Sequence, residues 1–228
     1  MKTNIKIISI LLSGTFGFFA CSSDSPKTIP YKIVEKDSSA QQLTFRMTLE
    51  ERGEKEQLIE IARQLKNERK WDRKLICFFD IKVPSNSIAW SSCFYLPDCK
   101  DCNTDKDKDG NGIEYKLIGL SKSAADSLNA LKFDSIPNKT FIGSYIDDLA
   151  HCKTELYKLS DNPSKVLMVQ LFKDGKTINM LKIKKADDQE RFIYPTDEGV
   201  YITIDNTNKS LTYYNKENKA FQTYPIEL

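Results

Sequence analysis

The chain has 228 residues, of which 40% are hydrophobic and 11% aromatic, so it can build packed cores and lacks the composition of a disordered protein. Its 34 basic and 32 acidic residues nearly balance, and no basic run carries interleaved aromatic residues. This charge pattern argues against nucleic-acid binding. The length allows one large domain or two small ones.

Residues 1–20 have the pattern of a secretory signal peptide. Lys2 and Lys6 precede an apolar run that is too short and too interrupted to span a membrane comfortably. Residues 18–21, Phe-Phe-Ala-Cys, resemble the lipobox of bacterial lipoproteins. That resemblance implies that the signal is cut before Cys21 and that the cysteine sulfur receives a diacylglycerol. The alternative is an ordinary signal peptide followed by an incidental cysteine.

Residues 21–30 predict a lipidated tether, because the stretch after Cys21 is polar, contains proline and has little to bury. Several acyl chains, palmitate among them, anchor a protein firmly, since each buried methylene contributes about 0.8 kcal/mol. We therefore expect a bacterial envelope protein held in a lipid bilayer. The expected bilayer is the outer membrane, and the sequence does not choose between its periplasmic and surface faces.

Residues 31–137 predict an α+β lobe, with one main helix over a small sheet. Apolar residues from Leu58 to Leu65 recur at helical spacing on one face, and Thr48 with Glu51 predicts a capping box near the helix start. The expected strands are 31–35, 42–48, 75–79, 87–96 and 114–119, and a second, short helix is expected at 123–131.

Residues 138–228 predict an antiparallel β meander, because short apolar strands alternate with turns at a spacing of about eight to twelve residues. The sequence Lys173-Asp174-Gly175 is the strongest hairpin signal among these turns. The expected strands are 141–147, 154–159, 165–172, 177–185, 191–195, 200–204, 210–215 and 220–226.

Two sets of positions resemble a known kind of envelope protein. In the first half these are Ile61, Ala62, Lys66, Phe78, Phe79, Ala89, Trp90, Ile118 and Gly119. They are similar to a module of uncharacterised lipoproteins from Bacteroidota-type Gram-negative bacteria. In the second half Gly143, Tyr145 and Asp148 resemble the opening signature of a lipocalin-like β-domain, with tyrosine in place of its tryptophan. The resemblance spans roughly residues 40–225, implies that the meander is a lipocalin-like half-barrel, and brings no reaction with it.

The segment 98–115 is rich in cysteine, aspartate and glycine, and it raises the question of a calcium site. Asp107, Asp109 and Asn111 occupy the first, third and fifth positions of an EF-hand-like loop, and Asp105 starts an alternative frame. Neither frame supplies the bidentate glutamate that closes such a site. Weak calcium binding is therefore the metal expectation, and no other cofactor is expected.

The cysteines allow two other chemical interpretations. Cys99, Cys102, His151 and Cys152 make a Cys₃His set for zinc, although a second regularly spaced knuckle is missing. The Cys99–Cys102 spacing also occurs in thiol oxidoreductases, but that chemistry needs a cysteine at a helix start, where its pKa is lowered. Here a proline and an aspartate precede Cys99 and an aspartate-rich loop follows it.

Structural disulfides are the simpler interpretation, because an exported protein folds under oxidising conditions. Cys77 and Cys93 stand opposite each other if the hairpin turn centres on Ser85, and Cys152 would tie the second lobe to the insert. Cys77 and Cys93 are alternatively two buried strand cysteines. An odd number of candidates leaves one thiol unpaired or joined to a partner molecule. The candidates are Cys77, Cys93, Cys99, Cys102 and Cys152.

The sequence contains no Gly-x-Ser-x-Gly motif, and no carboxylate pair stands out for acid–base chemistry. We therefore predict a non-catalytic lipoprotein that acts as a binding module, with acylated Cys21 in the bilayer and an envelope or secreted protein as partner. An immunity-type protein that neutralises a toxin would fit the same profile. The other alternative is a lipocalin-like carrier of a small apolar ligand, whose cavity would be lined by Tyr145, Phe172, Tyr201 and Tyr213.

Overall fold

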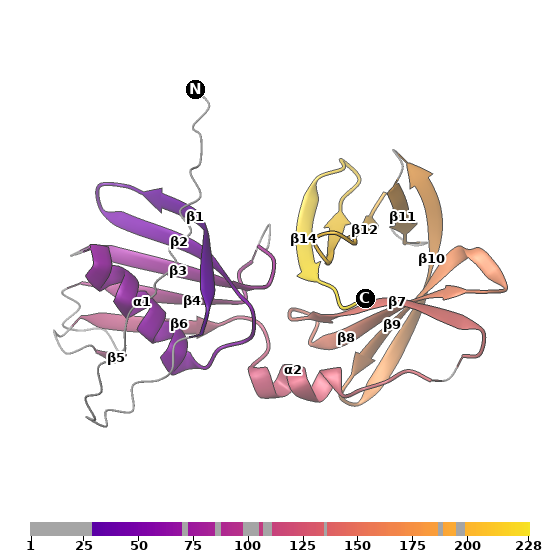
Figure 1. The fold of residues 1–228 in the computed structure, drawn as a ribbon, viewed down its shortest axis with the longest axis horizontal. Coiled ribbons are helices and arrows are strands. Elements are labelled where there is room, and N and C mark those ends of the chain that lie inside the picture. The colour runs from indigo at the N-terminus through magenta and orange to yellow at the C-terminus, as the bar shows by residue number, and fades with distance from the viewer. Residues whose placement is uncertain are drawn as a thin grey trace, which may run out of the picture.

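The computed structural model describes residues 29–69, 73–84, 88–97, 105–106, 111–134, 136–186, 189–194 and 199–228. These residues form two lobes that lie side by side (Figure 1). The predicted signal peptide and Cys21 lie outside them. Among the helices of these segments, none is long and apolar enough to cross a membrane.

The first lobe is a mixed sheet covered by one helix, which confirms the predicted α+β class. Strands β2 and β3 are parallel and are joined through helix α1, whereas the other neighbouring strands are antiparallel. The strand order is β1-β2-β3-β4-β6-β5. The elements are β1 (Tyr31–Ser38), β2 (Gln42–Leu49), α1 (Lys55–Arg69), β3 (Lys74–Ile81), β4 (Ser91–Leu96), β5 (Asp105–Lys106) and β6 (Gly112–Leu117).

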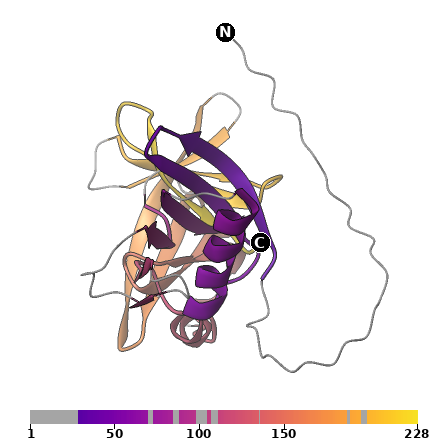
Figure 2. The same ribbon diagram turned by 90° about the vertical axis from the view of Figure 1, so that its left-hand side faces the viewer.

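Helix α1 lies across one face of this sheet (Figure 2) and buries Leu58, Ile61 and Leu65 against it. The predicted capping box of Thr48 and Glu51 is wrong, because β2 continues through Leu49 and the helix begins at Lys55. The side-chain oxygen of Gln57 instead accepts a hydrogen bond from the backbone N–H of Glu54 at 2.9 Å. This is one half of a capping box, placed six residues further along the chain.

The second lobe is an eight-stranded antiparallel meander in which each strand pairs with the next, as the strand spacing predicts. It is closed further than a half-barrel, because Ser144 of the first strand forms a bridge with Glu227 beyond the last. The result is a nearly closed barrel. Its strands are β7 (Lys139–Asp147), β8 (Cys152–Leu159), β9 (Asn162–Phe172), β10 (Gly175–Ala186), β11 (Gln189–Ile193), β12 (Tyr201–Asp205), β13 (Ser210–Tyr214) and β14 (Ala220–Pro225).

Helix α2 (Lys122–Asn129) packs on the barrel rather than on the first sheet (Figure 1). It begins after Ser121, whose hydroxyl accepts a hydrogen bond from the N–H of Ala124 at 3.3 Å. At its other end Lys153 of β8 donates to the carbonyl oxygens of Asn129 at 3.3 Å and Leu131 at 2.8 Å. A lysine at the C-terminal end of a helix satisfies carbonyl groups that have no partner within the helix. The boundary expected at residue 137 stays a prediction.

The two lobes are joined through Arg52, which follows β2. Its guanidinium group forms a forked ion pair with Asp148 of the barrel, with N–O distances of 2.7 and 2.9 Å. Only 11% of the arginine side chain and 19% of the aspartate side chain are exposed. Such planar, two-point contacts fix orientation as well as distance. Arg52 therefore fixes the angle at which the lobes meet.

Trp90 and Leu120 complete this junction. The carbonyl oxygen of Leu120 accepts hydrogen bonds from the Trp90 indole at 2.9 Å and from Arg52 at 3.2 Å. The N–H of Leu120 donates to Asp148 at 2.9 Å, and Arg52 lies over the Trp90 ring at 5.5 Å from its centroid. The link between the lobes passes through this network at Gly119. We call Arg52, Trp90, Gly119, Leu120 and Asp148 the junction.

Gly119→Ala should destabilise the protein, because the junction has no room for a side chain at this position. An added Cβ would lie 2.6 Å from the Trp90 ring and 2.8 Å from Asp148. We expect a loss of roughly 1–3 kcal/mol in the free energy of unfolding, typical of overpacking. Denaturant unfolding measures it. Gly175→Ala is the matched control, since nothing lies within 4 Å of an added Cβ there. Equal stability of the two variants would contradict a tightly packed junction.

Candidate functional site

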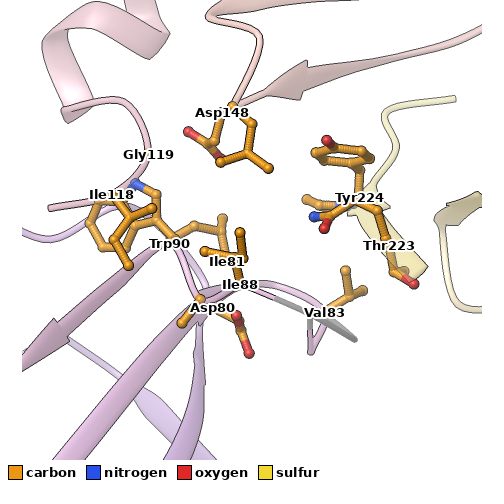
Figure 3. A pocket seen from close by; sticks show the side chains of 14 residues that line it. Asp80, Ile81, Val83, Ile88, Trp90, Ile118, Gly119, Asp148, Thr223 and Tyr224 are labelled. Atoms are coloured by element: carbon orange, nitrogen blue, oxygen red, sulfur yellow. The ribbon is translucent and has the colours of Figure 1, made fainter. Parts of the chain in front are cut away.

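A small pocket opens between the lobes beside the junction (Figure 3). Trp90 belongs to the first lobe, and Ile118 belongs to the link that follows β6. On the barrel side, Asp148 follows β7, and Thr223 and Tyr224 come from β14. Its volume is about 40 Å³, which is far smaller than the pockets that hold small-molecule ligands. We call it the seam pocket.

A larger hollow lies next to the seam pocket, at one end of the barrel. Its volume is about 750 Å³, and it is widely open to solvent. Leu149, Gln222 and Tyr224 line both the hollow and the seam pocket, so the two adjoin. We call it the tyrosine hollow. Its lining residues are Asp147, Leu149, Ala150, Gln170, Tyr194, Val200, Tyr213, Phe221, Gln222 and Tyr224.

Large apolar side chains are exposed along this continuous surface. Ile88 and Ile118 line the seam pocket with 49% and 39% of their surface exposed. Leu149 and Phe221, at 50% and 42%, border the tyrosine hollow. Contiguous exposed apolar groups rimmed by polar residues mark binding sites more often than isolated ones do. The surface spans both lobes, and its geometry therefore depends on the junction.

Tyrosine hydroxyls form a hydrogen-bonded cluster beneath the hollow. The hydroxyl of Tyr213 contacts that of Tyr145 and lies 3.3 Å from that of Tyr194, and Tyr194 donates to the sulfur of Met168 at 3.1 Å. Tyr145 is buried and stacks on Tyr224, with ring centroids 4.8 Å apart. These contacts bind side chains from β7, β9, β13 and β14 together at one end of the barrel.

The polar chain continues across the barrel interior. Tyr145 is hydrogen-bonded to Thr154, and Thr154 lies 3.8 Å from the Cys152 sulfur. The amide of Gln170 also donates to that sulfur at 3.8 Å, and its oxygen accepts from Thr177 at 3.0 Å. One end of the barrel therefore holds hydroxyl, thiol and amide groups, while Leu156, Val166 and other apolar side chains fill the interior beyond it.

Burial keeps these phenols neutral. Desolvation is the main cause that raises the pKa of Tyr145, Tyr213 and Tyr224, and the nearby Asp147 carboxylate raises each further. Tyr224 is hydrogen-bonded to Asp147. One oxygen of this carboxylate also accepts the N–H groups of Leu149 at 3.1 Å and Ala150 at 2.9 Å. Asp147 thus closes the β7–β8 turn and faces the hollow at the same time.

The residues expected to line a carrier cavity are placed differently from one another. Tyr213 lines the hollow and Tyr145 lies buried beneath it. Tyr201 is not a lining residue; it stacks on Tyr214 with ring centroids 4.9 Å apart. Phe172 does not line the hollow either, because it ends β9 at the two-residue Lys173–Asp174 turn.

The candidate cysteines fall into three places. Cys77 and Cys93 are direct cross-strand partners on β3 and β4, both are buried, and their thiols are free in this structure. Burial raises the pKa of Cys77 and raises that of Cys93 to about 12. Cys152 has a free thiol inside the barrel. Cys99 and Cys102 lie outside the described residues. The disulfides therefore stay a prediction.

The expected calcium loop lies mostly outside the described residues. Asp107 and Asp109 lie outside the described residues, and Asp105 belongs to the short strand β5. Asn111 donates a hydrogen bond to the Tyr95 hydroxyl at 3.2 Å. In the described segments no group of three or more His, Cys, Asp or Glu could hold a metal. Calcium binding stays a prediction.

His151, from the zinc interpretation, is exposed in the turn between β7 and β8. Its backbone φ is 54°, in the left-handed region. Cys152, the next residue, points into the barrel and forms its contacts there. Cys99 and Cys102, the other members of the set, lie beyond the described part of the chain, so the zinc interpretation stays untested.

Sequence reasoning did not single out Asp147, Tyr194, Phe221 and Tyr224 as neighbours. A signal for them exists in the strand pattern. In an antiparallel meander the odd strands end where the even strands begin. Tyr194 follows the end of β11 and Phe221 lies at the start of β14, so both fall at the same end of the barrel.

Tyr145→Phe should change how stability depends on pH. An unfolded tyrosine ionises near pH 10, whereas the pKa of Tyr145 in the folded protein is raised. The neutral phenol therefore contributes its full stabilising free energy below about pH 10 and loses it as the pH rises above 10. At neutral pH we expect the variant to lose about 1 kcal/mol with its hydroxyl contacts. Above pH 10 the gap should close by up to about 1.4 kcal/mol per pH unit. Parallel stability profiles from pH 7 to 11 would contradict a buried neutral phenol.

The chain was compared with known proteins at three levels. Family models, curated proteins and solved structures all gave no match to this chain. The candidate site therefore rests on its own geometry: an open aromatic hollow above a buried cluster of neutral phenols, adjoining a seam between two lobes.

Proposed function

We propose that the protein is an envelope lipoprotein, anchored through acylated Cys21, that acts as a non-catalytic binding module. The sequence supports the anchor through the lipobox-like residues 18–21 and the polar tether at 21–30. The tyrosine hollow and the apolar surface beside it are the binding site in this proposal. The partner is an envelope or secreted molecule that reaches this end of the barrel.

The observation that carries the proposal is the exposed, continuous surface from Ile88 across the seam pocket to Phe221. Aromatic and aliphatic groups of this kind gain free energy when a partner removes them from water. Because Arg52 and Asp148 hold the two lobes together, the surface is organised before a partner arrives. A rigid surface loses less conformational entropy on binding than a flexible one.

The chemistry of the hydroxyl cluster also favours binding over catalysis. A general base or nucleophile needs a pKa near the working pH, or a neighbouring base that activates it. The pKa values of Tyr145, Tyr213 and Tyr224 are raised instead, so these phenols remain protonated. Protonated phenols whose hydroxyls contact one another offer a ligand ring contacts rather than a general base.

A lipocalin-like carrier is the second candidate, and one observation favours it: the hollow lies at the open end of a nearly closed barrel. Below the tyrosine cluster, however, Leu156, Met168, Leu181 and Ile202 fill the interior. A ligand would therefore lie at the mouth, where it stays partly exposed, rather than enclosed in the barrel. That geometry suits recognition better than transport.

Photo-crosslinking in cells tests the binding site. A photoreactive amino acid in place of Phe221 should form a discrete adduct, because this position borders the hollow. The same amino acid at Ile178 is the matched control, since this residue is 46% exposed on β10 and does not line the hollow. Equal adducts from both positions, or none from either, would argue against this surface as the site.

Cys21→Ser tests the anchor. The variant should lose its acyl groups and move from the membrane fraction to the soluble fraction, because serine offers no sulfur for the diacylglycerol. Intact mass of the purified protein, before and after the change, measures the acyl groups directly. Native protein that carries no acyl group would overturn the lipoprotein proposal.

A further inference from the structure

The lining of the tyrosine hollow has an unusual balance of ring and charge. Four of its residues are aromatic: Tyr194, Tyr213, Phe221 and Tyr224. Among the residues that the structure describes, Asp147 is the one charged residue of the lining, and no lysine, arginine or histidine is part of it. An anionic ligand would find no opposite charge there. A cationic ligand would find one carboxylate and several electron-rich rings.

The rings are inclined to one another rather than stacked in one direction. Tyr213 and Tyr224 have ring planes at 77° with centroids 6.0 Å apart, and Tyr213 and Phe221 are at 53° and 5.9 Å. Tyr194 lies 6.4 Å from Tyr213 at 28°. Tyr224 is 6% exposed and one of its faces is covered by Tyr145, so the partly exposed rings that border the hollow are Tyr194, Tyr213 and Phe221. Each aromatic face carries negative potential and attracts a cation within about 6 Å.

The hydroxyl and carboxylate groups of the site are partly engaged within the protein, which leaves few acceptors for a new donor. The hydroxyls of Tyr145, Tyr194 and Tyr213 contact one another. Asp147 accepts two backbone N–H groups and is hydrogen-bonded to Tyr224. A primary ammonium group needs three acceptors to replace its water. A quaternary ammonium group needs none, and ring faces with one nearby carboxylate satisfy it.

We propose that the tyrosine hollow binds a quaternary ammonium group, such as the trimethylammonium of choline. Tyr194, Tyr213 and Phe221 supply the ring faces, and Asp147 supplies the compensating charge. The inference rests on the proposed binding function and names the ligand chemistry of the same site. The group reaches the hollow either as a free small molecule or as a lipid headgroup.

A neutral isostere of choline tests whether the hollow recognises the charge of the ligand or only its shape. Choline and 3,3-dimethylbutan-1-ol have the same outline, but only choline is charged. We expect the Cys21→Ser chain to bind choline at least about fivefold more tightly than the alcohol, the ratio that a cation–π contact at a partly exposed site provides. Titration followed by NMR or calorimetry measures both constants. Equal affinities, or no binding of choline, would overturn the inference.

Matched variants locate the site. Phe221→Leu should weaken choline binding by about threefold or more while changing the affinity for the alcohol by less than about twofold, because it removes a ring face and keeps an apolar group. Phe141→Leu is the control, since Phe141 is also exposed but lies outside the hollow. Asp147→Asn should weaken the binding of choline more than the binding of the neutral alcohol. Loss of choline binding in the Phe141 variant alone would place the site elsewhere and overturn the inference.

Vesicles distinguish the two sources of the group. If the headgroup is the ligand, the Cys21→Ser chain should bind phosphatidylcholine vesicles but not phosphatidylglycerol vesicles, and free choline should compete. Binding of choline without binding of vesicles supports a free ligand. If the protein does not bind choline but the crosslink from position 221 still forms, the inference is wrong and the proposed function stands. If both fail, neither stands.

Discussion

The arrangement of the two lobes depends on one guanidinium group. Arg52 simultaneously pairs with Asp148, donates to the Leu120 carbonyl and lies over the Trp90 ring. Removing one member of such a buried pair leaves an uncompensated charge, which is more costly than never having had the pair. The first sheet, the link and the barrel therefore keep a fixed relation to one another, and so does the surface that crosses the seam.

Adjacent aspartates divide two tasks at the end of β7. Asp148 turns toward the first lobe and completes the junction, whereas Asp147 closes the β7–β8 turn and faces the hollow. Strands β7, β9, β11 and β13 end at this side of the barrel, so the turn lies among their last residues. The connection between the lobes and the candidate binding site are thus built from the same few residues of one turn.

The fold could be read largely from the sequence, whereas the site could not. Strand spacing and turn residues predicted all eight strands of the meander, because period-two alternation and turns are local signals. The ion pair of Arg52 with Asp148 joins residues 96 positions apart, and no local pattern encodes it. The tyrosine hollow likewise needs the register of the whole sheet. The capping box was misplaced because Thr48 and Glu51 have the right spacing, whereas β2 continues through Leu49 and the capping contact is made by Glu54 and Gln57.

The seal between the first and last strands of the barrel has a consequence for the order of assembly. Glu227 exchanges backbone hydrogen bonds with Ser144, both at 2.8 Å, and Ile226 packs into the core. Gly143 is pressed against Ile226, where an added Cβ would lie 2.6 Å from that side chain. A chain emerging residue by residue from a ribosome or a translocation channel can finish the first lobe early. The barrel must wait for positions 226 and 227, and until they arrive β7 presents an unpaired edge to other chains.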